Sequence, residues 1–456
     1  MFILKSFIHF FLVLSYPVIA CLLCAQTTTA IEQRIDTSSS MTAEEPLTSL
    51  LLNSPLAEQD STELPSATQI QPTAEIFRPV VLPNTPEKKA LYYSLGQPYR
   101  FVTEFEKYIE EKVAPNVPGV AVVIVADGKI QSMRVWGVKK FGGKDKITPD
   151  TIFRLASVSK TLASTAAAIL VNQGKIRWDT KVLSLLPGVA FKNKKYAAQL
   201  TLKHLLSQAT GLPTHTSSNF IEADKPYSEA VNRLKYSRFV CAPGKCYAYQ
   251  NITFSLAGDM LEKKSGQSFE QFVKHYLFDP LGMKTASYGL NSYLLSPNHA
   301  LPHVRRRKSW SMVDVTENYY RIAPAAGANA SIADMAQFLL AQLGKRPEIL
   351  PRLVLNQMQT RVTKNTPEQN HYTKQHAVFN TAYGLGWRVF DYGKHRNFVH
   401  HGGWVKGFRS EMVFNRDLQI GMVFLTNSET RLARDVIFQF MDMHERAYDA
   451  AHPQKK

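Results

Sequence analysis

The chain has 456 residues, of which 45% are hydrophobic, so it is long enough to bury one large core or two modest ones. Its formal net charge of +17 favours polyanionic surroundings such as nucleic acid, anionic lipid or an acidic cell envelope. The lysines and arginines are scattered in short clusters, and no nucleic-acid-binding module is visible by motif. We therefore expect no binding to DNA or RNA.

The first 25 residues predict a secretory targeting segment. Lys5 and His9 precede an uncharged run over residues 10–20, as in a signal peptide. The four residues that end at Cys21 resemble the bacterial lipobox, which predicts lipidation of Cys21. The alternative is an uncleaved helical anchor, since apolar character continues to Ala25 and reaches the length of a bilayer span. Both alternatives predict a membrane-anchored protein of the bacterial periplasm.

Residues 26–90 are rich in Thr, Ser, Pro, Glu and Gln and poor in aromatic residues. Such a composition cannot bury enough apolar area to offset the entropy of ordering the chain, so we expect a disordered tether. A tether behind an anchor lets a domain stand away from the membrane. Residues 91–450 predict one globular domain.

The first elements of this domain are a helix and a hairpin. Residues 101–113 have helical periodicity. A β-branched run over 120–126 ends at Asp127-Gly128, which favours a tight turn, and 130–136 is the returning strand. Residues 159–173 then predict an apolar, Ala-rich helix that Gly174 closes.

Residues 200–284 predict mostly helices broken by turns. Near the C-terminus, strands over 410–414 and 418–425 are joined by 415–417, and a helix over 431–448 closes the chain. Strands at both chain ends with helices between them predict an α/β (α+β) fold. One antiparallel sheet built from both chain ends would be flanked by helices and accompanied by a helical subdomain.

Cys241 and Cys246 are the two cysteines outside the targeting segment, separated by the turn-forming sequence Ala-Pro-Gly-Lys. In an oxidising compartment they predict a local disulfide. Free thiols and metal ligation are the alternatives. No second Cys or His pair at zinc-like spacing accompanies them, so we expect no metal.

Ser157 and Lys160 form the chain's one Ser-x-x-Lys motif, at the predicted start of the apolar helix. Residues three apart lie on one face of a helix, one turn apart. A helix N-terminus favours a developing anion on Ser157, and apolar surroundings would lower the pKa of Lys160 so that it acts as a neutral base. An ordinary N-cap serine is the alternative interpretation.

Tyr249 and Asn251 are two residues apart in a segment that we expect to be extended or looped. Side chains at this spacing point the same way, so a phenol and a carboxamide would face one site. Tyr249 could move a proton there, and Asn251 could orient a substrate amide. An ordinary Tyr-Asn turn is the alternative.

His401-Gly402-Gly403 follows the strand-like residues 398–400. The two glycines allow another backbone to approach closely, as when a substrate lies along a strand edge, although a simple glycine turn is the alternative. His400 and His401 are adjacent, but consecutive strand residues face opposite sides, so we expect no shared metal.

In this order and at these separations, the three motifs resemble the Ser-x-x-Lys, Tyr-x-Asn and Lys-Thr-Gly boxes of class C β-lactamases and related esterases and D-peptidases. These proteins belong to the serine β-lactamase and penicillin-binding-protein family. The connecting sequence is similar too, and the resemblance covers roughly residues 101–425. It includes residues 153–156, 200–206, 210–213, 243–244, 280–283, 327–336 and 383–387.

The resemblance implies a β-lactamase/transpeptidase-like fold and a serine hydrolase that acts through an acyl-enzyme. Its substrate would be an ester, a D-amino-acid peptide or a β-lactam. This substrate would be a small molecule or a compound derived from peptidoglycan. No metal or organic cofactor is implied, and we expect a monomer. The implied catalytic residues are Ser157, Lys160 and Tyr249; the substrate-binding residues are Asn251, His401, Gly402 and Gly403; the oxyanion hole uses the N–H groups of Ser157 and Trp404.

One departure from the family pattern concerns the third box, which begins with Lys in true β-lactamases and with His401 here. A mostly neutral imidazole attracts a substrate carboxylate less than an ammonium does. Lys406 or Arg409 could supply the missing cation. A catalytically silent relative that binds peptidoglycan is the alternative function, but Ser157, Lys160 and Tyr249 are all present. The Gly-x-Ser-x-Gly elbow of α/β-hydrolases is absent.

Overall fold

The computed structural model describes residues 99–364, 371–372 and 377–452. The predicted targeting segment 1–25, with Cys21, and the predicted tether 26–90 lie outside the described residues. Within the described ranges, no helix is both long and apolar enough to cross a membrane.

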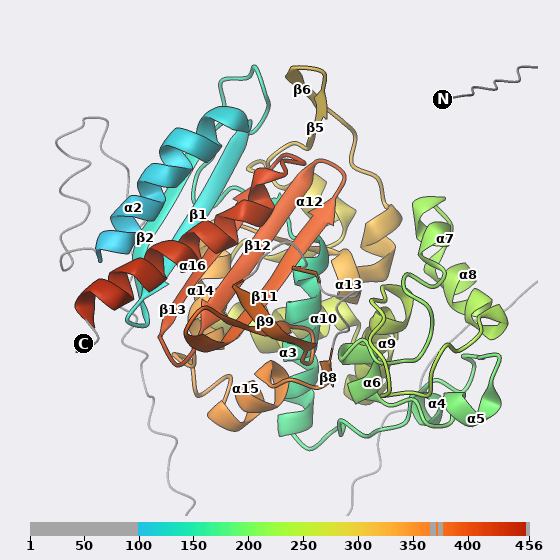
Figure 1. Cartoon of the computed structure of the whole chain (residues 1–456). Coiled ribbons are helices and arrows are strands. Elements are labelled where there is room, and N and C mark those ends of the chain that lie inside the picture. Colours follow the sequence, from blue (N-terminus) through green and yellow to red (C-terminus); the bar gives the residue numbers. More distant parts are fainter. Residues whose placement is uncertain (1–98, 365–370, 373–376, 453–456) are drawn as a thin grey trace, which may run out of the picture. The chain divides into compact units, whose positions relative to one another are not determined.

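An antiparallel sheet of eight strands forms the centre of the domain, in the order β2-β1-β13-β12-β11-β10-β9-β8 (Figure 1). Both chain ends contribute to it, because β1 pairs with β13 and places Val120 opposite Thr426. This is the sheet that the sequence predicts. Its strands are β1 (Gly119–Ala126), β2 (Lys129–Gly137), β8 (Thr363–Lys364), β9 (Val378–Tyr383), β10 (Arg388–Tyr392), β11 (His395–Val405), β12 (Phe408–Asn415) and β13 (Ile420–Thr426).

Two smaller sheets lie outside the main one. The three-stranded sheet has the order β3-β7-β4, and the two-stranded sheet is the hairpin β5–β6. Their strands are β3 (Phe153–Arg154), β4 (Ser287–Tyr288), β5 (His303–Arg306), β6 (Ser309–Met312) and β7 (Ala328–Ala330). Strand β3, which pairs with β7, leads directly into the first motif.

Helices cover both faces of the main sheet. The described helices are α2 (Arg100–Tyr108), α3 (Ser159–Asn172), α4 (Val182–Leu185), α5 (Lys194–Ala197), α6 (Leu202–Leu206), α7 (Ser218–Glu222), α8 (Tyr227–Asn232), α9 (Ile252–Ser265), α10 (Phe269–Val273), α11 (Asp279–Leu281), α12 (Leu290–Leu295), α13 (Ala323–Ala326), α14 (Ile332–Gln342), α15 (Arg352–Gln359) and α16 (Leu432–Ala451). Figure 1 shows α2 and α16 together across one face, while the other face carries α14.

Strand β1 shows how the sheet separates two hydrophobic cores. Its side chains alternate between the faces. Ala121, Val123 and Val125 belong to the larger core with α3 and α9, whereas Val122 and Ile124 belong to the core under α2 and α16. A strand buried on both faces explains the unbroken apolar run in the sequence.

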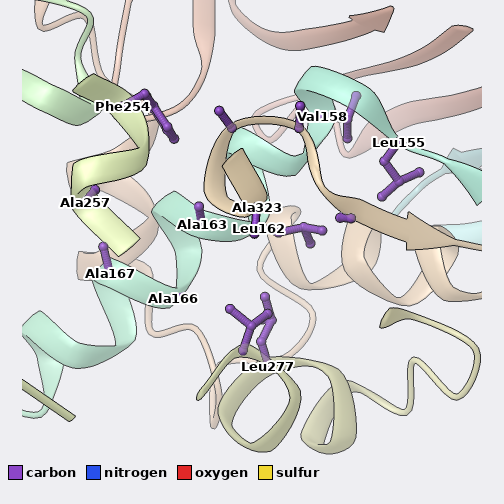
Figure 2. Packing of buried hydrophobic residues seen from close by; sticks show 14 of the residues in the cluster. Leu155, Val158, Leu162, Ala163, Ala166, Ala167, Phe254, Ala257, Leu277 and Ala323 are labelled. Atoms are coloured by element: carbon purple, nitrogen blue, oxygen red, sulfur yellow. The ribbon is translucent and has the colours of Figure 1, made fainter. Parts of the chain in front are cut away.

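Helix α3 passes through the larger core and is buried over nearly its whole length. Figure 2 shows its alanines Ala163 and Ala167 beside α9, with Ala257 and Phe254 close by, and Leu162 toward Ala323 of α13. Small side chains let the neighbouring helices approach α3 closely. The Ala-rich sequence therefore allows α3 to be buried among its neighbours, from its first residue, Ser159, onward.

Several predicted boundaries need correction. Strand β13 begins at Ile420 rather than at residue 418, because the side chain of Asn415 accepts hydrogen bonds from the N–H groups of Asp417 and Leu418 and holds a turn there. Helix α2 ends at Tyr108 and continues as a π-helical turn over Ile109–Val113. Strands β8 to β10 were not predicted.

Candidate active site

Ser157 lies in a 3-10 turn, Ala156–Val158, directly before α3. The preceding residue, Ala156, has a φ of 49°, which costs energy for a residue with a Cβ. The turn carries the chain from β3 into α3 and leaves Ser157 half-buried, at the wall of a cavity of about 750 Å3. The predicted nucleophile is thus accessible to a small molecule.

Lys160 lies in the first turn of α3 and is fully buried. Its Nζ is 3.4 Å from Oγ of Ser157 and donates hydrogen bonds to Oδ1 of Asn251, at 2.8 Å, and to the carbonyl oxygen of Ala325, at 2.9 Å. Burial, and then the positive charge of Arg388, hold the pKa of the Lys160 amine well below its usual value. The site therefore favours the neutral form of this amine over its ammonium form.

Tyr249 reaches the same point from the segment before α9. Its hydroxyl hydrogen-bonds with Ser157, and the Nζ of Lys160 lies 4.7 Å from the centre of its ring. Burial raises the pKa of the Tyr249 phenol, while the Ser157 hydrogen bond and the charge of Arg388 lower it, and the net change is upward. The phenol is therefore protonated at neutral pH.

The side chain of Gln250 explains why its two neighbours face the cavity. Gln250 is fully buried, and its main chain is held on both sides by the side chain of Gln208. Tyr249 and Asn251 consequently point to the opposite side, where both line the cavity. This is the alternation predicted for residues two apart in an extended segment.

The third motif lies on β11, against the turn that holds Ser157. A Cβ at Gly403 would lie 2.3 Å from the carbonyl oxygen of Leu155, and a Cβ at Gly402 would lie 2.4 Å from Oε2 of Glu411. Neither position has room for a side chain. β10 pairs with β11 only as far as His400, so no strand among the described residues pairs with residues 401–405 on that side.

Trp404 follows the two glycines and lines the cavity, with 58% of its surface exposed. The predicted oxyanion donors are the N–H groups of Ser157 and Trp404. The close approach of Gly403 to Leu155 holds the two segments that carry these N–H groups against each other. Ser157 and Trp404 both line the cavity, so the two predicted donors belong to neighbouring segments of its wall.

His401 is not among the residues that line the cavity, and only 1% of its surface is exposed. Its Nδ1 donates to the carbonyl oxygen of Gly402 and its Nε2 accepts from the hydroxyl of Tyr383, each at 2.9 Å, in the neutral tautomer that fits both partners. Burial first, then Arg388 and Lys160, hold the pKa of His401 well below its usual value. The geometry thus gives this neutral side chain no direct contact with a bound substrate.

Charged side chains from distant parts of the sequence also line the cavity. Arg388, Arg409 and Arg434 lie on its wall together with His371, Glu222 and Glu411. Glu411 accepts a hydrogen bond from Nε2 of His400 at 2.8 Å. Of the two cations suggested for the third box, Arg409 lies on the wall, whereas Lys406 is exposed and does not.

Arg388 is the functional candidate that the sequence reasoning missed. It begins β10, directly after the family-like segment that ends at Trp387. Recognising residues 388–392 as a strand beside the third motif would have placed this guanidinium near Tyr249. Its position depends on the pairing of Arg388 with His400, which is a long-range feature.

Cys241 and Cys246 form a disulfide. The N–H of Gly244, inside the closed turn, donates to the carbonyl oxygen of Ala209 at 2.8 Å. The second motif follows the turn directly, so the crosslink helps to hold that segment.

Within the described residues, no group of three or more His, Cys, Asp or Glu side chains is arranged to hold a metal ion.

This chain is similar to several known proteins. The beta-lactamase family model matches residues 105–439, which is most of the chain. The protein flp of Staphylococcus aureus (strain MW2) is 22% identical over 314 residues, which cover 68% of this chain and 60% of flp. Penicillin-binding protein 4 of Amycolatopsis lactamdurans is 28% identical over 178 residues, which cover 39% of this chain and 46% of that protein. The chain thus matches less than two thirds of the length of either relative.

A solved structure shows the same fold. The octameric penicillin-binding protein homologue from Pyrococcus abyssi superposes with a TM-score of 0.65 and 22% sequence identity, over 77% of each chain. At this identity the likeness concerns the fold alone.

Proposed function

This chain belongs to the beta-lactamase family, and from that premise we propose that it is a serine hydrolase that forms an acyl-enzyme on Ser157. One observation carries the proposal: the side chain of Ser157 contacts both the amine of Lys160 and the hydroxyl of Tyr249. A serine hydroxyl is a weak nucleophile until a neighbouring base takes its proton. The site supplies that base and a second proton carrier.

The contacts of Lys160 indicate which residue is the base. A neutral amine has two N–H groups and one lone pair. Asn251 and Ala325 offer two acceptors for the N–H groups, which leaves the lone pair for the third direction, toward Oγ of Ser157. Lys160 therefore accepts the serine proton, and the protonated phenol of Tyr249 is available as an acid.

The reaction then proceeds in two steps. In the first, the Ser157 proton moves to Nζ of Lys160, Oγ bonds to the substrate carbonyl carbon, and the leaving group departs with the Tyr249 proton. The N–H groups of Ser157 and Trp404 donate to the oxyanion. In the second, a water molecule gives a proton to the Tyr249 phenolate and attacks the acyl carbon, and Lys160 returns its proton to Oγ of Ser157.

The cavity suggests substrate chemistry. The buried, neutral His401 does not supply a charge, but Arg409 and Arg434 lie on the wall. Guanidinium groups bind carboxylates through paired hydrogen bonds. We therefore propose that the substrate is an ester, a D-amino-acid peptide or a β-lactam that carries a carboxylate. The substrate would be a small molecule or a compound derived from peptidoglycan. We also propose that the enzyme acts as a monomer.

We also propose an envelope setting for this activity. The lipobox-like residues ending at Cys21, or the uncleaved anchor that is the alternative, would hold the domain at a membrane facing the bacterial periplasm. Replacing Cys21 by Ala should release the protein from membranes if Cys21 is lipidated. Unchanged partition into membranes would exclude the lipid anchor.

Active-site labelling tests the proposed function directly. We expect a fluorophosphonate or penicillin-type probe to modify Ser157, and Ser157→Ala to abolish both labelling and turnover. Ser159→Ala is a matched control, because Ser159 is fully buried and its Oγ accepts a hydrogen bond from the N–H of Ala328. Turnover that survives in Ser157→Ala would overturn the proposal.

The same experiment can identify the substrate class. The folded protein is exposed separately to short-chain p-nitrophenyl esters, a chromogenic cephalosporin and D-Ala-D-Ala peptides. Intact-mass analysis shows which compound leaves an acyl group on the protein, and product analysis shows which one is consumed. Comparing substrates with and without a carboxylate tests the contribution of Arg409 and Arg434.

A further inference from the structure

Arg388 is a buried cation on the wall of the cavity. Only 8% of its surface is exposed, and within the described residues no carboxylate forms an ion pair with it. Its Nη1 donates to the hydroxyl of Tyr247 at 3.1 Å. Burying an unpaired charge costs free energy, and a guanidinium cannot avoid that cost by losing its proton. A gain elsewhere must offset the cost.

The guanidinium faces the reactive groups. Its Cζ lies 5.5 Å from the centre of the Tyr249 ring and 5.7 Å from that of Tyr383. Its charge also acts on Lys160 of α3 and on His401 of β11. The other titratable groups around this part of the site are Tyr247, His215, His371, Tyr372, His400 and Glu411.

We propose that Arg388 is a positioning residue that keeps the Lys160–Tyr249 pair one proton short of full protonation, ready to receive the proton of Ser157. The inference rests on the proposed function, since it concerns the activation of the same serine. Full protonation would place an ammonium on Lys160 and a hydroxyl on Tyr249. Such a pair has no lone pair basic enough to take the serine proton, and Oγ would remain a hydroxyl.

The charge of Arg388 acts on both members of the pair in the same direction. A nearby cation disfavours a second cation on Lys160 and favours an anion on Tyr249, so it lowers both pKa values. The interaction is strong because the groups are buried and little water screens them. Either tautomer of the singly deprotonated pair can accept a proton from Ser157.

Neighbouring groups do not supply this charge. His401 is neutral in its buried position. The guanidinium of Arg409 lies over the ring of Trp404, 5.1 Å from its centre. Arg388 is the arginine whose charge bears on both Lys160 and Tyr249. From the strand beside the third motif, it thus provides the positive charge that acts on the Lys160–Tyr249 pair.

The test measures the pH dependence of Ser157 labelling by an uncharged fluorophosphonate, which requires the same activation of Oγ but no bound carboxylate. We compare the wild-type protein with Arg388→Gln, Arg388→Met and Arg388→Lys over about pH 5 to pH 10. In Arg388→Gln and Arg388→Met, we expect the pH at which labelling reaches half its maximum to rise by about one pH unit. Arg388→Lys keeps the charge and should keep the wild-type profile.

Three outcomes separate this role from others. A lower labelling rate at every pH with an unchanged midpoint would mean a purely structural role and would overturn the inference. An unchanged midpoint with a raised KM for carboxylate substrates alone would mean substrate binding and would overturn it as well. Failure of the wild-type protein to be labelled at Ser157 would refute the proposed function itself, whatever the variants do.

Folding of the variants is checked by thermal unfolding. Arg388→Met removes a buried charge without adding a polar group, so we expect it to fold even if Arg388→Gln does not. As a further check, guanidinium ion added to Arg388→Ala should return the midpoint toward the wild-type pH. If it restores only the maximal rate and not the midpoint, the charge is not the cause and the inference fails.

Discussion

Nζ of Lys160 and Oδ1 of Asn251 are joined by a hydrogen bond of 2.8 Å, although 91 residues separate them in the sequence. This contact couples the first motif to the second. Asn251 orients the amine and, because its amide is neutral, adds no negative charge that would favour the ammonium form of Lys160. A charged acceptor would have the opposite effect on the amine.

Asn251→Asp should therefore slow the enzyme in a pH-dependent way. A carboxylate next to Nζ stabilises the ammonium form and raises the pKa of Lys160, because opposite charges favour ionisation. We expect the acid limb of the labelling profile to move upward by about one pH unit or more. The uncharged variant Asn251→Ala should lower the rate about 10- to 100-fold without that upward shift. Equal midpoints in Asn251→Asp and Asn251→Ala would contradict the neutral-amine account.

Lys160→Met should separate catalysis from stability. The fold lowers the pKa of this amine, whereas the unfolded chain protonates it below the ordinary pKa of 10.5. The unfolded state therefore binds more protons, and the stability of the wild-type protein rises with pH through this window, by up to about 1.4 kcal/mol per pH unit. Met removes this dependence and retains the packing volume.

We expect Lys160→Met to lose Ser157 labelling and yet to be more stable than the wild-type protein at about pH 6, with the difference shrinking toward about pH 9. Chemical denaturation at both pH values measures it. The opposite result would be a stability difference between variant and wild type that is smaller at low pH than at high pH. That result would mean that Lys160 carries a proton in the folded protein.

Gly403→Ala tests the close approach between β11 and the turn before α3. The added Cβ would lie 2.3 Å from the carbonyl oxygen of Leu155 and from Oγ of Ser410, so the strand must shift. We expect a loss of about 1–3 kcal/mol in the free energy of unfolding and a larger loss of activity, as in other overpacked sites. Gly188→Ala is the matched control, because nothing lies within 4 Å of its added Cβ. Similar losses in both variants would count against the role of the approach.

The disulfide should support the second motif. Reducing the bond between Cys241 and Cys246, or replacing both residues by Ser, frees the turn that precedes Tyr249. We expect a decrease in stability of about 2 kcal/mol, together with slower labelling of Ser157. Thermal unfolding and labelling with and without reductant provide the measurement. Unchanged labelling in a destabilised variant would show that the crosslink acts on stability alone.

Much of the architecture could be predicted from the sequence. The hairpin β1–β2, helix α3, strands β12 and β13, and helix α16 all carry strong periodicity or turn signals, and each is present near its predicted bounds. Strands β8 to β10 were missed because their pairing depends on contacts with β11. A short segment such as Arg388–Tyr392 contains a buried Asp391 and has no simple alternation.

The candidate site, like the fold, could be predicted only in part from the sequence. The spacing of Ser157 and Lys160 places both side chains at one helix start, which local geometry suffices to predict. The burial of His401 could not be predicted, because it depends on Tyr383 from another strand. Arg388 stood in no motif, and only the sheet brings it to Tyr249. Local chemistry was thus visible in the sequence, whereas its electrostatic surroundings required the fold.

A rapid-quench reaction with an activated ester, followed by peptide mapping of the protein by mass spectrometry, measures the activation of Ser157 by Lys160 directly. We expect one acyl group per chain, located on Ser157, which appears before steady state and is absent from Ser157→Ala and Lys160→Met. Hydrolysis that proceeds while Ser157 stays unmodified, or an acyl group that forms equally well in Lys160→Met, would contradict the central claim that Lys160 activates Ser157 for acyl transfer.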